Sequence, residues 1–150
     1  MPVDASTKTI VLIDDEDTVI SLFYYMLERE GFKVVPFRSA TDAIAKLSAK
    51  RYKIDLIVLD LMMPGMGGYD MVKKLQELEI YRSTPIYILT ARNLDGETVE
   101  MIRAEPNVKG FYPKPADHKE FTSSVHKLLD TRKSEQAPTP SGSDPDDPFH

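Results

Sequence analysis

Hydrophobic residues occur along the chain in two alternating patterns: short apolar runs, and longer stretches in which apolar residues recur every three or four positions. The runs lie at Thr9–Ile13, Lys33–Val35, Leu56–Leu59, Ile86–Leu89 and Val108–Tyr112. The first, third and fourth are almost wholly apolar, which is typical of strands buried on both faces of a parallel sheet. The pattern therefore predicts five strands.

Stretches with helical spacing follow these runs. The first ends at Gly31, a residue type favoured just beyond a helix, the second begins at Ser39 or Thr41, and the fourth extends from about Asn93 to Glu105. For the first, second, third and fifth helices we also predict the buried face. In that order, its residues are Val19, Ile20, Phe23, Met26 and Leu27, then Ala43, Ile44 and Leu47, then Met71, Val72, Leu75 and Leu78, and finally Phe121, Val125, Leu128 and Leu129. Five strands that alternate with five helices predict an α/β domain with a parallel sheet.

The last 20 residues differ in composition from the rest of the chain. Residues 131–150 contain four of the 11 prolines, together with serine, aspartate and a single phenylalanine. Such a stretch buries too little apolar surface to offset the entropy lost on ordering. We therefore expect one domain at residues 1–130, followed by a disordered tail at residues 131–150.

Charge and composition exclude several classes of function. The chain has 19 basic and 24 acidic residues, so it lacks the broad basic surface that direct nucleic-acid binding requires. With no cysteine it has neither disulfides nor thiolate zinc sites. Its longest apolar runs are about six residues, far short of the roughly 20 that cross a bilayer, and its N-terminus does not look like a secretory signal. We expect a soluble cytoplasmic protein without membrane insertion.

Polar residues stand at the carboxyl ends of the predicted strands, where open parallel sheets bind their ligands. Asp14 and Asp15 follow the first strand, Asp60 the third and Thr90 the fourth, while Lys114 comes just after the fifth. If the strand order is 2-1-3-4-5, the three carboxylates converge. They would repel one another unless a divalent cation lay among them, and magnesium prefers oxygen ligands and often binds next to a phosphoryl group.

Each of these residues also has an ordinary structural interpretation. The acidic residues after the first strand could cap the next helix, Asp60 could belong to a turn, Thr90 could be an N-cap, and Lys114 could be a solvated loop residue. The coincidence of four such strand ends favours one phosphoryl–metal site. In it an acid pair holds the cation, a lone carboxylate is the nucleophile, and a hydroxyl and an ammonium bind the phosphoryl oxygens.

These residues resemble the receiver domain of two-component response regulators. The resemblance is to the chemotaxis type, in which the receiver is the whole protein. The matching motifs, which cover about residues 8–130 in both order and spacing, are Ile13-Asp14-Asp15-Glu16, Asp60-Leu61-Met62-Met63-Pro64-Gly65, Leu89-Thr90-Ala91 and Lys114-Pro115. The resemblance implies a doubly wound, flavodoxin-like sheet of five parallel strands in the order 2-1-3-4-5.

The resemblance also implies roles for individual residues. Asp60 would accept a phosphoryl group from a phosphohistidine. Mg²⁺, with Mn²⁺ as an alternative, would be bound by Asp14, Asp15, Asp60 and the backbone carbonyl of Met62. Thr90 and Lys114 would bind the phosphoryl oxygens. We expect no enzymatic activity beyond self-phosphorylation from a phosphodonor and slow autodephosphorylation.

Signalling would follow from a movement of Thr90 toward the phosphoryl group, with Phe111, three residues before the lysine, filling the vacated space. The fourth helix, fifth strand and fifth helix would then change as the surface for a downstream protein, or for dimerisation. Candidate contact residues on this surface are Arg92, Glu97, Glu100, Arg103, Lys109 and Lys119. The first helix, through Thr18, Ser21, Leu22 and Tyr25, would dock a histidine kinase or a histidine phosphotransfer protein.

Two other functions compete with this one. Asp15-Glu16-Asp17-Thr18-Val19 fits the short D-x-D-x-[T/V] pattern of haloacid-dehalogenase-like phosphatases, in which Asp15 would be the nucleophile, but that pattern leaves Asp60 unexplained. A receiver-like adaptor that works without phosphorylation would share the fold and make no use of Asp60.

Overall fold

The structure, a computed structural model, describes residues 1–49, 52–63, 65–90, 96–114 and 116–135. Its central sheet contains five parallel strands, β2 (Thr9–Ile13), β3 (Lys33–Phe37), β4 (Leu56–Asp60), β5 (Ile86–Thr90) and β6 (Val108–Pro113). They lie side by side in the order β3-β2-β4-β5-β6. When only these five strands are counted along the chain, β2 being the first, this is the order 2-1-3-4-5. The predicted fold class is therefore confirmed.

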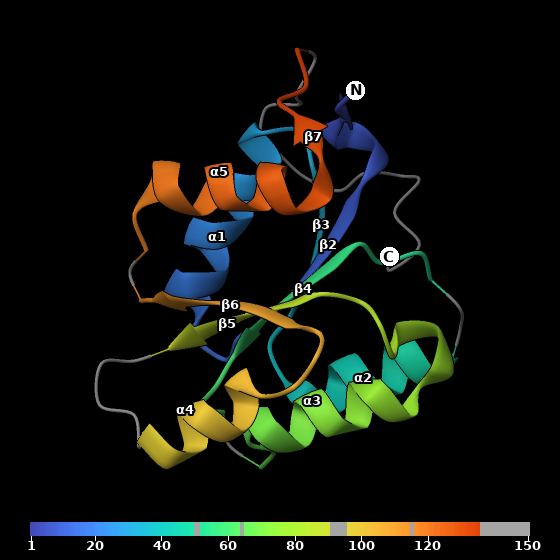
Figure 1. Cartoon of the computed structure of the whole chain (residues 1–150), viewed down its shortest axis with the longest axis vertical. Helices are drawn as coiled ribbons and strands as arrows, with labels where there is room; N and C mark the ends of the chain where they lie inside the picture. Colours follow the sequence, from blue (N-terminus) through green and yellow to red (C-terminus); the bar gives the residue numbers. More distant parts are fainter. Residues whose placement is uncertain (50–51, 64, 91–95, 115, 136–150) are drawn as a thin grey trace.

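Helices cover both faces of the sheet (Figure 1). The helices α1 (Asp17–Arg29) and α5 (His118–Leu129) lie on one face, and α2 (Ala40–Ala49), α3 (Gly68–Glu77) and α4 (Gly96–Arg103) lie on the other. The predicted fourth helix is described only from Gly96 onward, and it ends two residues before Glu105. None of the described helices is long and apolar enough to span a bilayer.

Alternating side chains of the strands enter two separate hydrophobic cores. In β4, where all five residues are buried, Ile57 and Leu59 pack toward α2, α3 and α4, whereas Leu56 and Val58 pack toward α1 and α5. Burial on both faces explains why this strand is an unbroken apolar run in the sequence. It also means that Asp60, the last residue of β4, is carried into the interior.

A second, two-stranded sheet joins the two ends of the domain, and the periodicity did not predict it. Strand β1 (Val3–Asp4), which precedes the central fold in the sequence, pairs in parallel with β7 (Thr131–Arg132), which follows it. The 3-10 helices η1 (Ala5–Thr7) and η2 (Glu79–Tyr81) were also not predicted. Elements of two or three residues are too short to show a hydrophobic period.

The prediction of a disordered tail from residue 131 is wrong for residues 131–135. Thr131 and Ser134 are buried, and the Ser134 amide donates a 2.9 Å hydrogen bond to the carbonyl of Glu30, in the turn that follows α1. The amide of Val3 donates to the carbonyl of Asp130 at 3.0 Å. We call residues 131–134 the strap. Backbone hydrogen bonds, rather than apolar side chains, order it, and residues 136–150 of the predicted tail lie outside the described residues.

Gly31 makes room for the strap, so Gly31→Ala should destabilise the domain. Gly31 has φ +106°, and a Cβ there would lie 2.5 Å from Cβ of Ser134. We expect the free energy of unfolding to fall by about 1–3 kcal/mol, measured by urea denaturation. Gly96→Ala is the control, because a Cβ at Gly96 would meet no atom of the described residues within 4 Å. Equal effects of the two substitutions would contradict the role given to the strap.

Candidate phosphoryl and metal site

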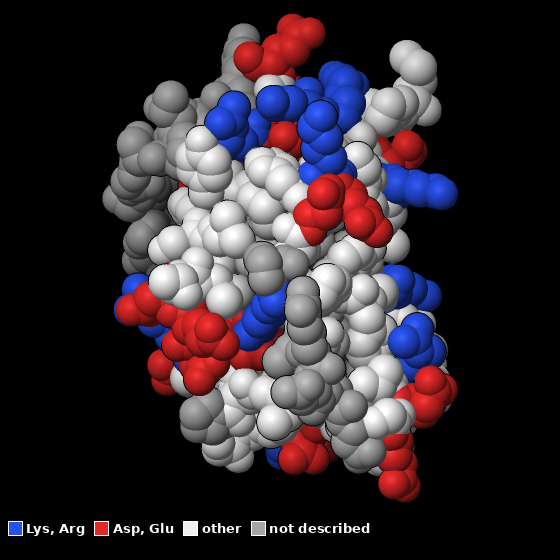
Figure 2. All heavy atoms as spheres, turned by 90° about the vertical axis from the view of Figure 1, so that its left-hand side faces the viewer, with Lys and Arg blue, Asp and Glu red and all other residues white. Residues whose placement is uncertain are grey.

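Four neighbouring strands bring the predicted site residues to one edge of the sheet. Asp14 follows β2, Asp60 and Thr90 end β4 and β5, and Lys114 follows β6. Because all these strands are parallel, their carboxyl ends meet at the same edge. Figure 2 looks onto this side of the molecule and shows acidic side chains gathered there, with basic atoms next to them.

Lys114 is the centre of this group. Its Nζ lies 2.8 Å from Oδ2 of Asp14, 3.1 Å from Oδ1 of Asp60 and 3.4 Å from Oε1 of Glu16. The backbone amide of Lys114 donates a 3.1 Å hydrogen bond to the carbonyl of Thr90, which fixes the backbone of Lys114 against the end of β5. Thus one ammonium bridges carboxylates from two strands.

The carboxylates differ in how far they are removed from water. Asp14 is fully buried and Asp60 is 2% exposed, whereas Asp15 and Glu16 are exposed. The amide of Glu16 donates to Oδ1 of Asp14 at 2.9 Å, and the amide of Met62 donates to Oδ1 of Asp60 at 3.1 Å. The other oxygen of Asp60, Oδ2, is buried and has no hydrogen-bond partner among the described residues. This oxygen is therefore left for a group that the described side chains do not supply.

Burial controls the protonation of the site. It raises the pKa of Asp60 from 3.8 to about 6, helped by the negative charge of Asp14 and opposed by hydrogen bonds from Met62 and Lys114. Burial alone would lower the pKa of Lys114, but hydrogen bonds to Asp14 and Asp60 and their charges raise it above its ordinary value. Lys114 therefore remains a cation at neutral pH.

The arrangement fits a hard divalent cation. Asp14, Asp15, Glu16 and Asp60 each offer a carboxylate oxygen, and these oxygens all lie within 4.8 Å of one another. Oxygen-only ligands at this spacing suit Mg²⁺. Three of the four were singled out in the sequence. Glu16 was not, although it continues the run of acids after the first strand.

The predicted switch residues also lie at this edge. Thr90 is half-buried at the end of β5, and Phe111 is half-buried in β6, where it packs against the core shared by α2, α3 and α4. The guanidinium of Arg103, on α4, lies 4.6 Å from the centre of the Phe111 ring. This cation–π contact links the predicted switch residue to α4.

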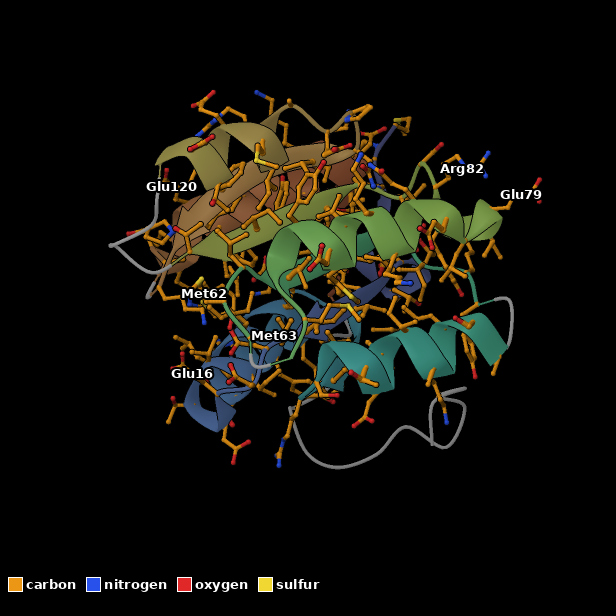
Figure 3. All side chains as sticks on the ribbon, turned by 90° about the horizontal axis from the view of Figure 1, so that it is seen from below. Glu16, Met62, Met63, Glu79, Arg82 and Glu120 are labelled. Carbon is orange, nitrogen blue, oxygen red and sulfur yellow. The ribbon has the colours of Figure 1, made fainter. Side chains whose placement is uncertain are left out.

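Methionines flank the entrance to the site. Met62 is 64% exposed, whereas Met63 is buried. Figure 3 shows Glu16, Met62 and Met63 at one end of the molecule, with Glu79 and Arg82 at the other. Arg92, one of the predicted contact residues of the output surface, lies outside the described residues.

Comparison with known proteins identifies the family. The family model described as "Response regulator receiver domain" matches residues 10–126. The chain belongs to this family. The receiver motifs of the sequence and the receiver fold therefore agree.

The curated relatives that match this receiver domain are response regulators. The alkaline phosphatase synthesis transcriptional regulatory protein PhoP of Bacillus subtilis is 34% identical over 130 residues, which cover 87% of this chain and 51% of PhoP. The response regulator SaeR of Staphylococcus aureus is 32% identical over 126 residues, which cover 83% of this chain and 51% of SaeR. The chain thus spans about half the length of these relatives.

Solved receiver structures have the same fold. The Vibrio cholerae chemotaxis protein CheY4 superposes with a TM-score of 0.71 at 24% identity, over 81% of this chain and 98% of CheY4. The receiver domain of the Pseudomonas aeruginosa sensor histidine kinase PA1611, solved with a magnesium ion coordinated in its active-site cleft, has a TM-score of 0.70 at 24% identity. It covers 81% of this chain and 97% of that domain.

The raised pKa of Asp60 predicts that Asp60→Asn stabilises the domain in a pH-dependent way. Below pH 3.8 the carboxyl is protonated in both the folded and the unfolded state, so it imposes no penalty. As pH rises from 3.8 through about 6 the unfolded state ionises first, and the folded state loses stability relative to it. In metal-free buffer we expect Asp60→Asn to add about 1–3 kcal/mol to the free energy of unfolding at pH 7.5.

Urea denaturation between pH 4 and pH 7.5 measures this gain, which should shrink toward the acidic end. Asp42→Asn, which removes an exposed carboxylate on α2, serves as the matched control and should show no such trend. A gain that is the same at both ends of the range would contradict the burial argument.

Proposed function

We propose that Asp60 accepts a phosphoryl group from the phosphohistidine of a histidine kinase or a histidine phosphotransfer protein. The observation that carries this proposal is Oδ2 of Asp60, which is buried without a hydrogen-bond partner among the described residues. The other oxygen of the same carboxylate is held by Lys114 and by the amide of Met62. The carboxylate is thus oriented by one restrained oxygen, and the other would be the oxygen that bonds to phosphorus.

The transfer moves a phosphoryl group between two nucleophiles. Oδ2 of Asp60 bonds to phosphorus while the P–N bond of the phosphohistidine breaks, and the imidazole leaves with the electron pair of that bond. Lys114 neutralises the negative charge that accumulates near Asp60, and the Thr90 hydroxyl donates to a phosphoryl oxygen. Such a transfer depends on positioning and electrostatics, so the domain needs no nucleotide site of its own.

The residues that would hold Mg²⁺ are Asp14, Asp15, Asp60 and the backbone carbonyl of Met62. The bound ion would neutralise charge between the carboxylates and the phosphoryl oxygens. The clustered carboxylate oxygens support this assignment, as does the magnesium ion in the cleft of the PA1611 receiver domain. Mn²⁺ prefers the same oxygen ligands and is the alternative ion.

We assign the output to the surface formed by α4, β6 and α5. Phosphorylation adds nearly two negative charges beside Lys114, and Thr90 and Phe111 respond to them. Arg103, in contact with the Phe111 ring, would carry the change to the surface of α4. The other described candidates on this surface, all exposed, are Glu97, Glu100, Lys109 and Lys119. A downstream protein, or a second receiver in a dimer, would bind there.

The phosphodonor would dock on α1. Leu22 and Tyr25 are each 42% exposed on this helix, which begins three residues after Asp14. Exposed apolar residues beside a reactive site are suited to a helical partner that must bring its phosphohistidine close to Asp60. Thr18 and Ser21 are exposed on the same helix.

The wider setting of the domain follows from its relatives. PhoP is named as a transcriptional regulatory protein, yet the present chain is acidic, so we assign it protein partners rather than direct contact with nucleic acid. Two-component signalling of this kind takes place in the cytoplasm, where we place the protein. The domain takes up a phosphoryl group and loses it slowly, without turnover of a separate substrate.

Phosphorylation of Asp60 can be tested directly. We expect acetyl phosphate with Mg²⁺ to add one phosphoryl group to the wild-type chain, and beryllofluoride with Mg²⁺ to bind it, because both use the free oxygen of Asp60. Asp60→Asn should abolish both reactions, whereas Asp42→Asn should leave them unchanged. Intact-protein mass spectrometry and ¹⁹F NMR measure the two outcomes.

The competing functions give different results in the same experiment. A wild-type chain that takes up no phosphoryl group and binds no beryllofluoride would favour the adaptor. Turnover of a phosphate ester that Asp15→Asn abolishes and Asp60→Asn does not would favour the phosphatase.

Met62 should prolong the life of the phosphorylated state. Its exposed apolar side chain follows the phosphoacceptor by two residues, where it would hinder the approach of water to phosphorus. We expect Met62→Asn to shorten the lifetime of phospho-Asp60 by about threefold to tenfold, the size of effect that positioning a water molecule can have. Ile80→Asn, at an exposed apolar residue of η2, is the control, and an unchanged lifetime in Met62→Asn would refute this role.

A further inference from the structure

Three hydroxyl groups connect the end of the sheet to α5 on the face opposite α4. Tyr87 of β5 and Tyr112 of β6 both point toward α1 and α5, and both contact Ser124 of α5. The Tyr87 hydroxyl donates to the carbonyl of Ser124 at 3.0 Å, and its oxygen lies 2.7 Å from Oγ of Ser124. The Tyr112 hydroxyl is hydrogen-bonded to the same Oγ. We call Tyr87, Tyr112 and Ser124 the hydroxyl cluster.

One arrangement of the hydroxyl protons gives every proton of the cluster an acceptor. Each hydroxyl has a single proton, and that of Tyr87 is used on the Ser124 carbonyl. In this arrangement the Ser124 hydroxyl donates to the oxygen of Tyr87, and Tyr112 donates to Ser124. Every proton of the cluster thus has an acceptor, and burial raises the pKa of Tyr87 to about 12, so that its proton stays in place at neutral pH.

The surroundings hold the two tyrosine rings in this arrangement. Their ring centres are 4.9 Å apart, and the ring of Phe121, from α5, packs edge-on against that of Tyr112 at 5.2 Å. Gly110 permits the geometry, because a Cβ there would lie 3.0 Å from Cε2 of Tyr112 and 3.4 Å from its hydroxyl oxygen. The Tyr112 ring therefore folds back over Gly110, and its position is set by β6 as well as by α5.

The cluster lies close to the phosphoryl site. Tyr112 is two residues before Lys114, and its neighbour across the sheet is Leu89, directly before Thr90. Phosphorylation of Asp60 would require Lys114, now bound to Asp14 and Asp60, to bind phosphoryl oxygens as well. Any displacement of Lys114 then passes through Pro113 and reaches Tyr112 before the rest of β6.

We propose that the hydroxyl cluster couples α5 to Lys114, with Tyr112 as the positioning residue, so that α5 follows the end of β6 when the site is loaded. This inference rests on the proposed phosphoacceptor function. It adds a route to α5 that is separate from Phe111, whose side chain lies on the opposite face of the same strand. Since coupling between two sites is reciprocal, a protein that binds and displaces α5 would in turn alter the phosphoryl site.

NMR of the full chain tests this coupling, first without any ligand. Removing the Ser124 hydroxyl with Ser124→Ala should shift the backbone amide signal of Lys114, although the two residues are ten positions apart. Tyr81→Phe is the control, because Tyr81 is a buried tyrosine whose hydroxyl accepts a hydrogen bond from the amide of Tyr52 in the other core. If Lys114 does not respond to Ser124→Ala, or responds equally to Tyr81→Phe, the proposal is overturned.

The second measurement adds beryllofluoride with Mg²⁺ and compares bound and free spectra within each variant. In the wild type we expect amide signals to change at Phe121 and Val125 in α5 and at Ile102 in α4. In Tyr112→Phe the α5 changes should be lost while the Ile102 change persists, and Tyr81→Phe should keep both.

The outcomes separate the two proposals. Undiminished α5 changes in Tyr112→Phe would overturn the coupling while leaving the phosphoacceptor function intact. A wild-type chain that does not bind beryllofluoride would overturn the phosphoacceptor function, and the response of Lys114 to Ser124→Ala would still decide whether the hydroxyl cluster links the two elements.

Discussion

The rest of the site depends on the two ion pairs of Lys114. Its ammonium group lies between the buried carboxylates of Asp14 and Asp60. Two carboxylates at this depth repel each other strongly, and removal from water adds a further penalty to their ionised forms. One lysine compensates both only because the strands hold it within hydrogen-bonding distance of each. A single positive charge among several negative ones still leaves the site able to attract a further cation.

The cost of burying these charges is met by the layers on either side of the sheet. The α2–α3–α4 core and the α1–α5 core contain most of the large apolar side chains of the domain, and β4 contributes to both. Burial of apolar surface at about 25 cal/mol per Å² stabilises the sheet enough to hold a charged group at its edge. The position of β4 between β2 and β5 helps to bury Asp60, because strands flank it on both sides.

Much of this arrangement could be predicted from the sequence, for reasons that also explain what was missed. The apolar runs of β2, β4 and β5 are long enough to show burial on two faces, and parallel strands place Asp14, Asp60, Thr90 and Lys114 at one edge. The strap could not be found in this way, because residues 131–134 are ordered by hydrogen bonds to distant backbone groups. Nor does the sequence show that Glu16 contacts Lys114, since that depends on how the loop after β2 turns.

The alternation of side chains along β6 explains how one event at its end can reach two helices. Phe111 enters the core beneath α4, and Tyr112, the next residue, enters the core beneath α5. The contacts differ in kind. Phe111 meets Arg103 through a cation–π interaction that tolerates sliding, whereas Tyr112 meets Ser124 through a hydrogen bond that weakens steeply when its angle changes. A displacement of Lys114 would therefore reach α4 through Phe111 and Arg103, and α5 through Tyr112 and Ser124.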